Sequence, residues 1–151
     1  MKTGAMAAVA FIVGMGARAE DTGGLPVNDP RVIAAMKTAW RQSANGSAGT
    51  EATFRLDGDP SDYKIVAAGF TNERMRQRVT IVPGRTFAVF HVHPTGGGPA
   101  PSRQDRNLAD KYRLKILTLH IRGLFEYDPV ERKTIKVRDG LGWLNSPKTA
   151  S

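Results

Sequence analysis

Apolar residues recur at helical spacing near the start of the chain. One face of a helix would carry the positions Val32, Ile33, Met36 and Trp40. Residues 28–30 read Asn-Asp-Pro, an Asx cap followed by a proline that suits the first helical turn, and Gly46 lies beyond the last apolar position. We therefore expect a helix that begins after Asp29 and ends by Gly46, with its apolar face in the core.

The apolar period shortens from residue 51 onward, where short apolar runs between turn signals are typical of β-strands. Strands are expected over residues 51–56, 63–70, 79–82, 86–93 and 114–121. A glycine- and proline-rich loop over 95–101 precedes a helix over 102–112, and a hairpin-like segment over 125–137 follows the last of these strands. This order predicts a single mixed β-sheet flanked by helices, in the α/β (α+β) class.

The N-terminal segment has the pattern of a secretory signal peptide. Lys2 precedes a short apolar stretch that ends in Ala-Arg-Ala at residues 17–19. We expect cleavage after Ala19, because the apolar stretch is shorter than the ~20 residues of a membrane-spanning helix. The predicted organisation is a signal peptide (1–19), a flexible lead-in (20–28), one domain (29–145) and a polar tail (146–151). A secreted or periplasmic protein without a stable membrane span is expected.

The amino-acid composition excludes some kinds of catalytic and metal-binding site but says little about the fold. The 151 residues include no cysteine, so a cysteine nucleophile and cysteine zinc ligands are excluded. The formal charge of +8 favours anionic partners. The basic residues of the chain are scattered and are not interleaved with aromatic residues, so specific nucleic-acid binding is not expected.

Two histidines stand at the end of the strand expected over residues 86–93. His91 and His93 would lie on one face of the sheet with Cα atoms roughly 7 Å apart, a span that two imidazoles can close around one metal ion. The alternative is a pair of partly exposed histidines at a strand edge. A catalytic site would also need a third protein ligand.

Asp105 is the candidate third ligand, because it lies in the first turn of the next helix, beside the end of the histidine strand. Ser102 and Asp105 also have the spacing of a capping box, in which both residues serve the helix terminus. Both interpretations can hold together, since a capped helix start is a rigid place for a ligand.

The run over residues 91–105 resembles the JAMM (JAB/MPN) metallopeptidase motif, H-x-H-P…S-x-x-D, and its wording is closest to the RadC-like bacterial branch. The resemblance covers residues 51–127 and includes an upstream glutamate, Glu51. Phe54 stands where the family more often has glycine, and the loop within the motif carries one extra residue. Glu73 is the alternative acid.

This resemblance implies a JAMM/cytidine-deaminase-like fold and a role for each motif residue. His91, His93 and Asp105 would bind Zn²⁺ and leave one position for water, whose pKa falls toward ~7. Glu51 would accept the proton of that water and later protonate the leaving amine. Ser102 would donate a hydrogen bond to the developing oxyanion. The implied reaction is hydrolysis of an amide or isopeptide bond in a peptide or protein substrate, cell-wall peptides included.

The alternative function is a non-catalytic binding module on the same fold, since the family includes members that lack the chemistry. His120 alternates with the apolar residues of its strand and is interpreted as structural. Trp143 is expected to be a packing anchor. Neither the oligomeric state nor the natural substrate can be inferred from these patterns.

Overall fold

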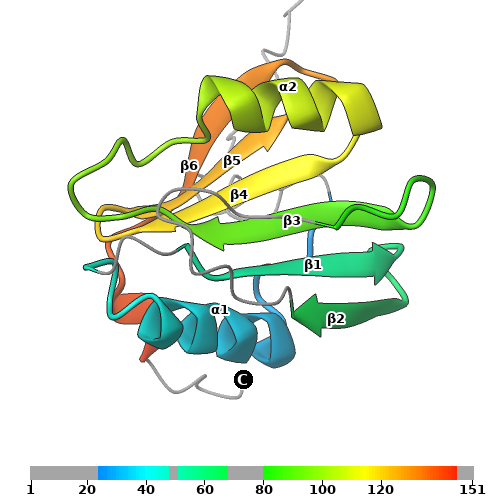
Figure 1. The fold of residues 1–151 in the computed structure, drawn as a ribbon. Coiled ribbons are helices and arrows are strands. Elements are labelled where there is room, and N and C mark those ends of the chain that lie inside the picture. Colours follow the sequence, from blue (N-terminus) through cyan, green and yellow to red (C-terminus); the bar gives the residue numbers. More distant parts are fainter. Residues whose placement is uncertain (1–23, 48–50, 68–79, 146–151) are drawn as a thin grey trace, which may run out of the picture.

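A six-stranded mixed sheet forms the centre of the protein, with one helix against each of its faces (Figure 1). The computed structural model describes residues 24–47, 51–67 and 80–145. Its elements in chain order are α1 (Pro30–Gln42), β1 (Thr53–Gly58), β2 (Tyr63–Ala67), β3 (Thr86–Val92), α2 (Arg103–Tyr112), β4 (Lys115–His120), β5 (Gly123–Asp128), β6 (Lys133–Asp139) and the short 3₁₀ helix η2 (Gly142–Leu144). The predicted single mixed sheet flanked by helices is therefore confirmed.

The strands lie in the order β2-β1-β3-β4-β5-β6. Within the described ranges β3 and β4 form the parallel pair, and every other neighbouring pair is antiparallel. A parallel pair needs a crossover connection, and here α2 supplies it. The crossover brings the start of α2 back to the end of β3.

Helix α1 begins as its sequence predicts, because the Asp29 carboxylate accepts a hydrogen bond from the Arg31 N–H and Pro30 occupies the first turn. The helix ends at Gln42, and its buried residues Val32 and Met36 pack against the sheet. Burial of such side chains is the main stabilising term for a helix of this length.

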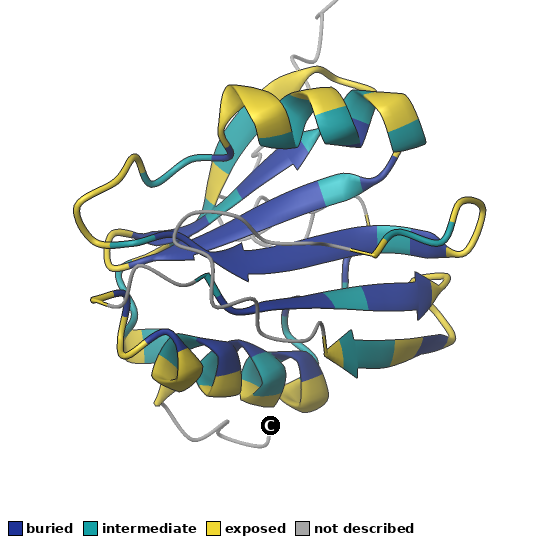
Figure 2. Cartoon of the chain, in the orientation of Figure 1, coloured by how far each residue is buried: buried dark blue, intermediate teal, exposed yellow. Residues whose placement is uncertain are grey.

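Two apolar clusters hold the layers together, and Figure 2 shows the buried strands between helices that expose their outer surfaces. Phe90 and Val92 of β3 belong to the larger cluster, on the α1 side. Val89 belongs to the smaller cluster, which includes Ala109 of α2. Side chains alternate along a strand, so the two histidines that follow Val89 at two-residue steps face α2.

Some predicted boundaries were wrong. No strand covers the described residues 80–82 of the strand predicted over 79–82. The Val82 carbonyl instead accepts the N–H groups of Arg85 and Thr86 at 3.0 and 2.9 Å, so a turn uses the backbone that a strand would need. Leu25 and Val27 are buried in the larger cluster, so the packed domain includes part of the predicted flexible lead-in.

Residues 1–23, which hold the predicted signal peptide, and the predicted tail over 146–151 lie outside the described residues. Among the described helices, none is both long and apolar enough to span a bilayer. Trp143 is partly buried against the larger cluster and donates a hydrogen bond to the Gly140 carbonyl at 2.8 Å, so its predicted packing role is confirmed.

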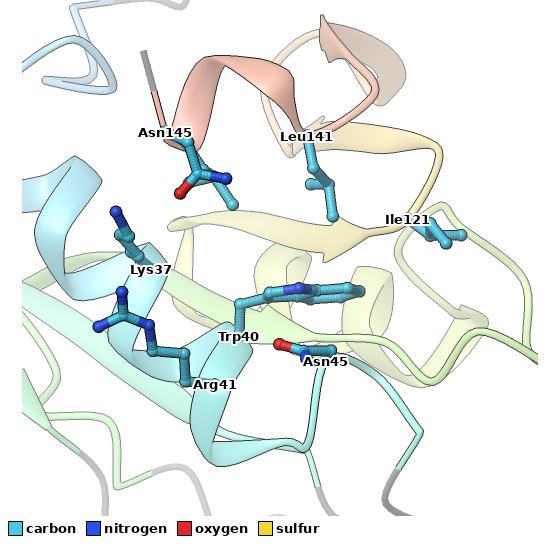
Figure 3. A pocket seen from close by; sticks show the side chains of 8 residues that line it. Lys37, Trp40, Arg41, Asn45, Ile121, Leu141 and Asn145 are labelled. Carbon is cyan, nitrogen blue, oxygen red and sulfur yellow. The ribbon is translucent and has the colours of Figure 1, made fainter. Parts of the chain in front are cut away.

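A pocket of about 480 Å³ opens beside Trp40, between the end of α1 and the η2 segment (Figure 3). It lies on the α1 side of the sheet, away from α2.

Candidate metal centre

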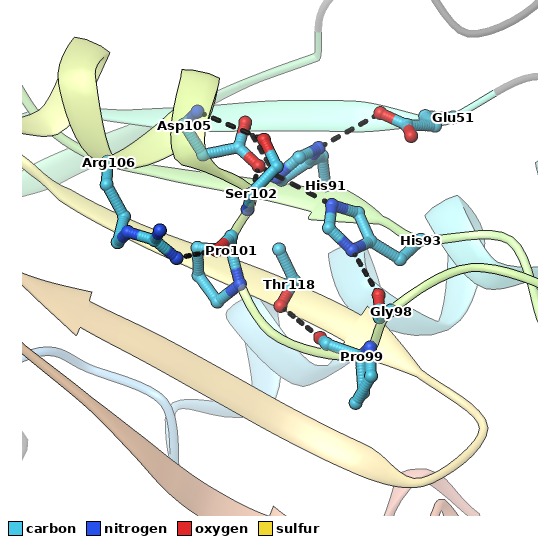
Figure 4. Close-up of polar contacts among 10 residues, drawn as sticks. All are labelled: Glu51, His91, His93, Gly98, Pro99, Pro101, Ser102, Asp105, Arg106 and Thr118. Atoms are coloured by element: carbon cyan, nitrogen blue, oxygen red, sulfur yellow. Dashed lines mark hydrogen bonds and ion pairs between the residues drawn. The ribbon is translucent and has the colours of Figure 1, made fainter.

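The end of β3 and the first turn of α2 bring three predicted ligands together. His91 is a buried residue of β3 and His93 directly follows the strand, where its N–H continues the sheet by donating to the Leu119 carbonyl at 2.9 Å. Asp105 projects from the first turn of α2 toward both imidazoles (Figure 4). Their convergence follows from the parallel crossover, which places a helix N-terminus beside the carboxyl end of the strand.

His91 is held between two carboxylates. Its Nδ1 lies 3.2 Å from Glu51 Oε2, and its Nε2 lies 3.5 Å from Asp105 Oδ1. The side chain is only 6% exposed. A hydrogen bond to the carboxylate oxygen makes His91 Nδ1 the donor, and in the neutral imidazole the Nε2 lone pair then faces Asp105.

His93 has the same arrangement with different partners. Its Nδ1 donates to the Gly98 carbonyl at 2.8 Å, and its Nε2 lies 3.6 Å from Asp105 Oδ2. A carbonyl oxygen cannot donate, so Nδ1 carries a proton, and in the neutral imidazole the Nε2 lone pair faces Asp105. The two rings are 4.7 Å apart between centroids and nearly perpendicular, at 87°.

These distances fit a shared cation better than direct hydrogen bonds. Charge-assisted N–H···O bonds are about 2.7–2.9 Å long, whereas two ligands of a tetrahedral zinc ion lie about 3.4 Å apart when each is about 2.1 Å from the metal. The Nε2–carboxylate distances of 3.5 and 3.6 Å match the second case. The buried Nε2 of His91 also has no hydrogen-bond partner among the described residues. Orientation of metal-binding histidines through their other nitrogen is typical of metal sites.

Glu51 forms a second possible ligand set with the two histidines, and this set does not include Asp105. Ligand atoms of Glu51, His91 and His93 all lie within 4.8 Å of one another, so these three residues could hold a metal ion. The predicted base therefore lies close enough to be a ligand as well. Phe54, which departs from the family pattern, stacks on Phe90 at 4.6 Å and belongs to the larger cluster on the α1 side. The departure at position 54 thus falls on the other face of the sheet.

Electrostatics within the site favour a charged Asp105. Burial works to raise the pKa of the Asp105 carboxyl, but His93, His91 and the Ser102 groups outweigh burial and lower that pKa well below its ordinary value. Burial likewise works to lower the pKa of His93, yet the Asp105 carboxylate and the Gly98 carbonyl raise it above its ordinary value. Asp105 therefore remains anionic and attracts a cation to the two imidazoles.

Ser102 and Asp105 form the predicted capping box. The Ser102 N–H donates to Asp105 Oδ2 at 2.6 Å, and the Asp105 N–H donates to the Ser102 hydroxyl at 3.1 Å. Asp105 thus caps α2 and faces both histidines at once, as the two compatible interpretations of its sequence position allowed.

The loop between the histidines and α2 is anchored by residues that the sequence pattern did not single out. Thr118, which is fully buried on β4, donates to the Pro99 carbonyl at 2.6 Å. Arg106 donates to the Pro101 carbonyl at 2.9 Å. Together with the bond from His93 to Gly98, these contacts fix the second half of the loop, from Gly98 to Pro101. The register of β3 and β4, which places Thr118 opposite His91, is a tertiary feature with no local sequence signal.

No protein-family model, curated protein or solved structure matches this chain. Only the geometry of the site and its sequence pattern therefore bear on function.

Two further candidates complete the set of predicted residues. His120 is buried at the end of β4, and its Nδ1 accepts the Arg122 N–H at 3.1 Å. Burial lowers the pKa of His120, with further lowering from Arg122 and His93 against a smaller opposing effect of nearby carbonyls. Glu73, the alternative acid, lies outside the described residues.

Proposed function

We propose that this chain is a zinc-dependent hydrolase of the JAMM type that cleaves an amide or isopeptide bond in a peptide-like substrate. The observation that carries the proposal is the convergence of two imidazole Nε2 atoms on the Asp105 carboxylate at 3.5 and 3.6 Å. Two imidazoles and one carboxylate form a ligand set of catalytic zinc enzymes, in which a fourth position stays open.

Zinc held by His91, His93 and Asp105 would act as a Lewis acid and lower the pKa of a water molecule toward ~7. The chain itself supplies the proton acceptor. Glu51 uses one carboxylate oxygen to contact His91, which leaves Oε1 without a hydrogen bond among the described residues. At 16% side-chain exposure Glu51 can exchange protons with solvent and substrate. It therefore suits the role of general base and acid.

Ser102 suits the role of oxyanion donor. Its hydroxyl oxygen already accepts the Asp105 N–H, so the hydroxyl proton is available to a substrate oxygen. Ser102 is exposed at the start of α2, where the helix dipole also favours negative charge. A developing oxyanion would be stabilised by both effects.

The predicted signal peptide over residues 1–19 would place this activity outside the cytoplasm. Peptide or protein substrates, cell-wall peptides included, are the substrate class that this proposal names.

One observation favours a second candidate, a non-catalytic metal-binding module. Glu51 lies within 4.8 Å of both histidine ligand atoms. If Glu51 and Asp105 both bound the ion, four protein ligands would close the coordination shell, as in structural zinc sites. The two candidates thus differ in whether Glu51 binds the metal or acts on water.

The test combines metal analysis with a hydrolysis assay. Purified protein is expected to contain near-stoichiometric zinc and to cleave members of a panel of peptides, isopeptides and muropeptides. Asp105→Ala should lose both properties, whereas Asn107→Ala, which changes an exposed residue of the same helix, should keep both. Zinc retention without cleavage of any panel member would support the binding module. Absence of zinc from the wild-type protein under metal-replete conditions would refute both candidates.

A further inference from the structure

The pocket beside Trp40 is separate from the metal centre. Trp40 lies on α1, which covers one face of the sheet, whereas Asp105 lies on α2 at the other face (Figure 1). The volume of about 480 Å³ is within the range of small-molecule sites. Nothing in the proposed hydrolysis uses this pocket.

Apolar and cationic groups occupy opposite sides of the pocket. Figure 3 shows Lys37 and Arg41 on one side of the Trp40 ring and Ile121 on the other side, with Leu141 nearby. Ile121 also lines the pocket and is 54% exposed, so its apolar side chain is accessible to a ligand there. The pocket thus offers an apolar surface that continues into a positively charged end.

Two cations, Lys37 and Arg41, form the charged end of the pocket. Lys37 and Arg41 stand one helical turn apart on α1, and neither forms an ion pair within the part of the chain that the structure describes. Two adjacent cations of like charge repel each other, and an anion between them would relieve that repulsion. Asn145, which also lines the pocket, adds an amide that can donate a hydrogen bond to the same anion.

The aromatic wall is held in a fixed position. Gly46 packs so closely under the Trp40 ring that a Cβ at position 46 would lie 2.8 Å from a ring carbon. Gly46 also has φ of +76°, a conformation that favours glycine. A preformed wall of this kind lowers the entropic cost of ligand binding.

From these features we infer that the pocket binds an amphipathic carboxylate, namely a carboxylate joined to an aromatic or branched aliphatic group. The carboxylate lies between Lys37 and Arg41, and the apolar group covers Trp40 toward Leu141 and Ile121. The same chemistry occurs at the C-terminus of a peptide that ends in an apolar residue and in a free arylalkyl acid.

The probe is N-acetyl-L-phenylalanine, and its neutral amide is the matched control. Isothermal titration of the full chain should give a Kd on the order of 1 mM for the acid, as expected for a ligand of this size. The amide should bind about tenfold more weakly, since it loses the charge-assisted hydrogen bonds. Equal affinity of acid and amide, or binding of neither, would overturn the inference.

Variants locate the site. Lys37→Gln/Arg41→Gln should abolish the preference for the acid, whereas Lys111→Gln/Lys133→Gln, which removes two exposed charges elsewhere, should preserve it. An unchanged preference in the first double variant would place the carboxylate elsewhere and refute the assignment.

The remaining arms identify the ligand source and separate this inference from the proposed function. A Gly-Gly-Phe peptide that binds more tightly than 3-phenylpropionate supports a peptide C-terminus as the ligand, and the reverse order supports a free acid. Asp105→Ala should keep the acid preference even if it loses zinc, because the two sites lie on different faces of the sheet. Thermal unfolding of the Lys37→Gln/Arg41→Gln variant serves as its folding control, and the wild-type comparison of acid with amide decides the inference if that variant fails to fold.

Discussion

Asp105 has a proposed metal-binding role and a capping role, and substitutions can separate the two. Its carboxylate faces both histidine Nε2 atoms, and one of its oxygens also accepts the Ser102 N–H at 2.6 Å. Asp105→Asn keeps an oxygen that can accept this N–H but removes the negative charge. Ser102→Ala removes the hydroxyl that accepts the Asp105 N–H and leaves the carboxylate in place. We therefore expect the first change to affect metal affinity and the second to affect helix stability.

The expected magnitudes differ enough to be distinguished. Structural zinc sites with four ligands contribute roughly 10–16 kcal/mol, or about 3 kcal/mol for each ligand, so loss of the Asp105 charge should weaken zinc binding by about 100-fold or more. Loss of an N-cap hydroxyl costs about 1 kcal/mol, which for a domain of this size lowers the melting temperature by about 4 °C. Ser102→Ala should weaken zinc binding less than Asp105→Asn does, because it removes no proposed ligand.

Competition against a chromogenic zinc chelator measures the affinity, and thermal unfolding of the chelator-treated proteins measures the cap contribution without metal. Ser102→Ala should melt lower than the wild type in the metal-free comparison, and Asp105→Asn should show the larger loss of zinc affinity. Equal zinc affinity for wild type and Asp105→Asn would mean that Asp105 only caps α2. In that case Glu51 would have to complete the ligand set with the two histidines.

Three further outcomes are expected. Glu51→Gln should keep zinc and reduce the hydrolysis rate by roughly 100-fold or more, the usual effect of losing a general base. Loss of zinc from this variant would make Glu51 a ligand. Thr118→Val should lower the free energy of unfolding by about 1–3 kcal/mol, because the Pro99 carbonyl loses its buried donor; an unchanged denaturant midpoint would contradict this. Burial works to raise the pKa of Asp57, but Arg55 and Thr86 outweigh burial and lower it. The stability that Asp57 contributes is therefore present above pH ~4 and is lost as pH falls through the lowered folded-state pKa. The difference in free energy of unfolding between wild type and Asp57→Asn should shrink in acid, and a difference that stays constant with pH would refute this.

Local patterns predicted the elements that carry the site. The apolar run over residues 86–93 indicated a buried strand, and the observed β3 covers Thr86–Val92 with buried side chains on both faces. The Ser102–Asp105 spacing indicated a helix start, and both capping bonds are present. Each of these signals depends on residues only a few positions apart, so each can be recognised from the sequence alone.

The errors arise where tertiary contacts decide. Residues 79–82 are rich in β-branched residues, yet the described part does not form a strand, because the Val82 backbone serves the turn that leads into β3. The glycines and the proline near Leu25 and Val27 suggested a flexible lead-in, but both side chains are buried in the larger cluster on the α1 side of the sheet. The contact of Glu51 with His91 spans 40 positions and depends on the register that pairs Thr53 with His91.

The placement of this site also explains how its charges are tolerated. Burial of a carboxylate beside two imidazoles carries a desolvation cost. Here the carboxylate lies at a helix N-terminus, which favours negative charge and offsets part of that cost. The capping bond from Ser102 satisfies one Asp105 oxygen, and the Glu51 and Gly98 acceptors satisfy the Nδ1 protons of the histidines. In the neutral imidazoles the two Nε2 lone pairs face Asp105, between β3 and α2. The proposed zinc site is thus oriented through contacts that also stabilise the helix and the loop, so we expect a variant that removes a proposed ligand while keeping its capping bond to fold and to lose only the metal.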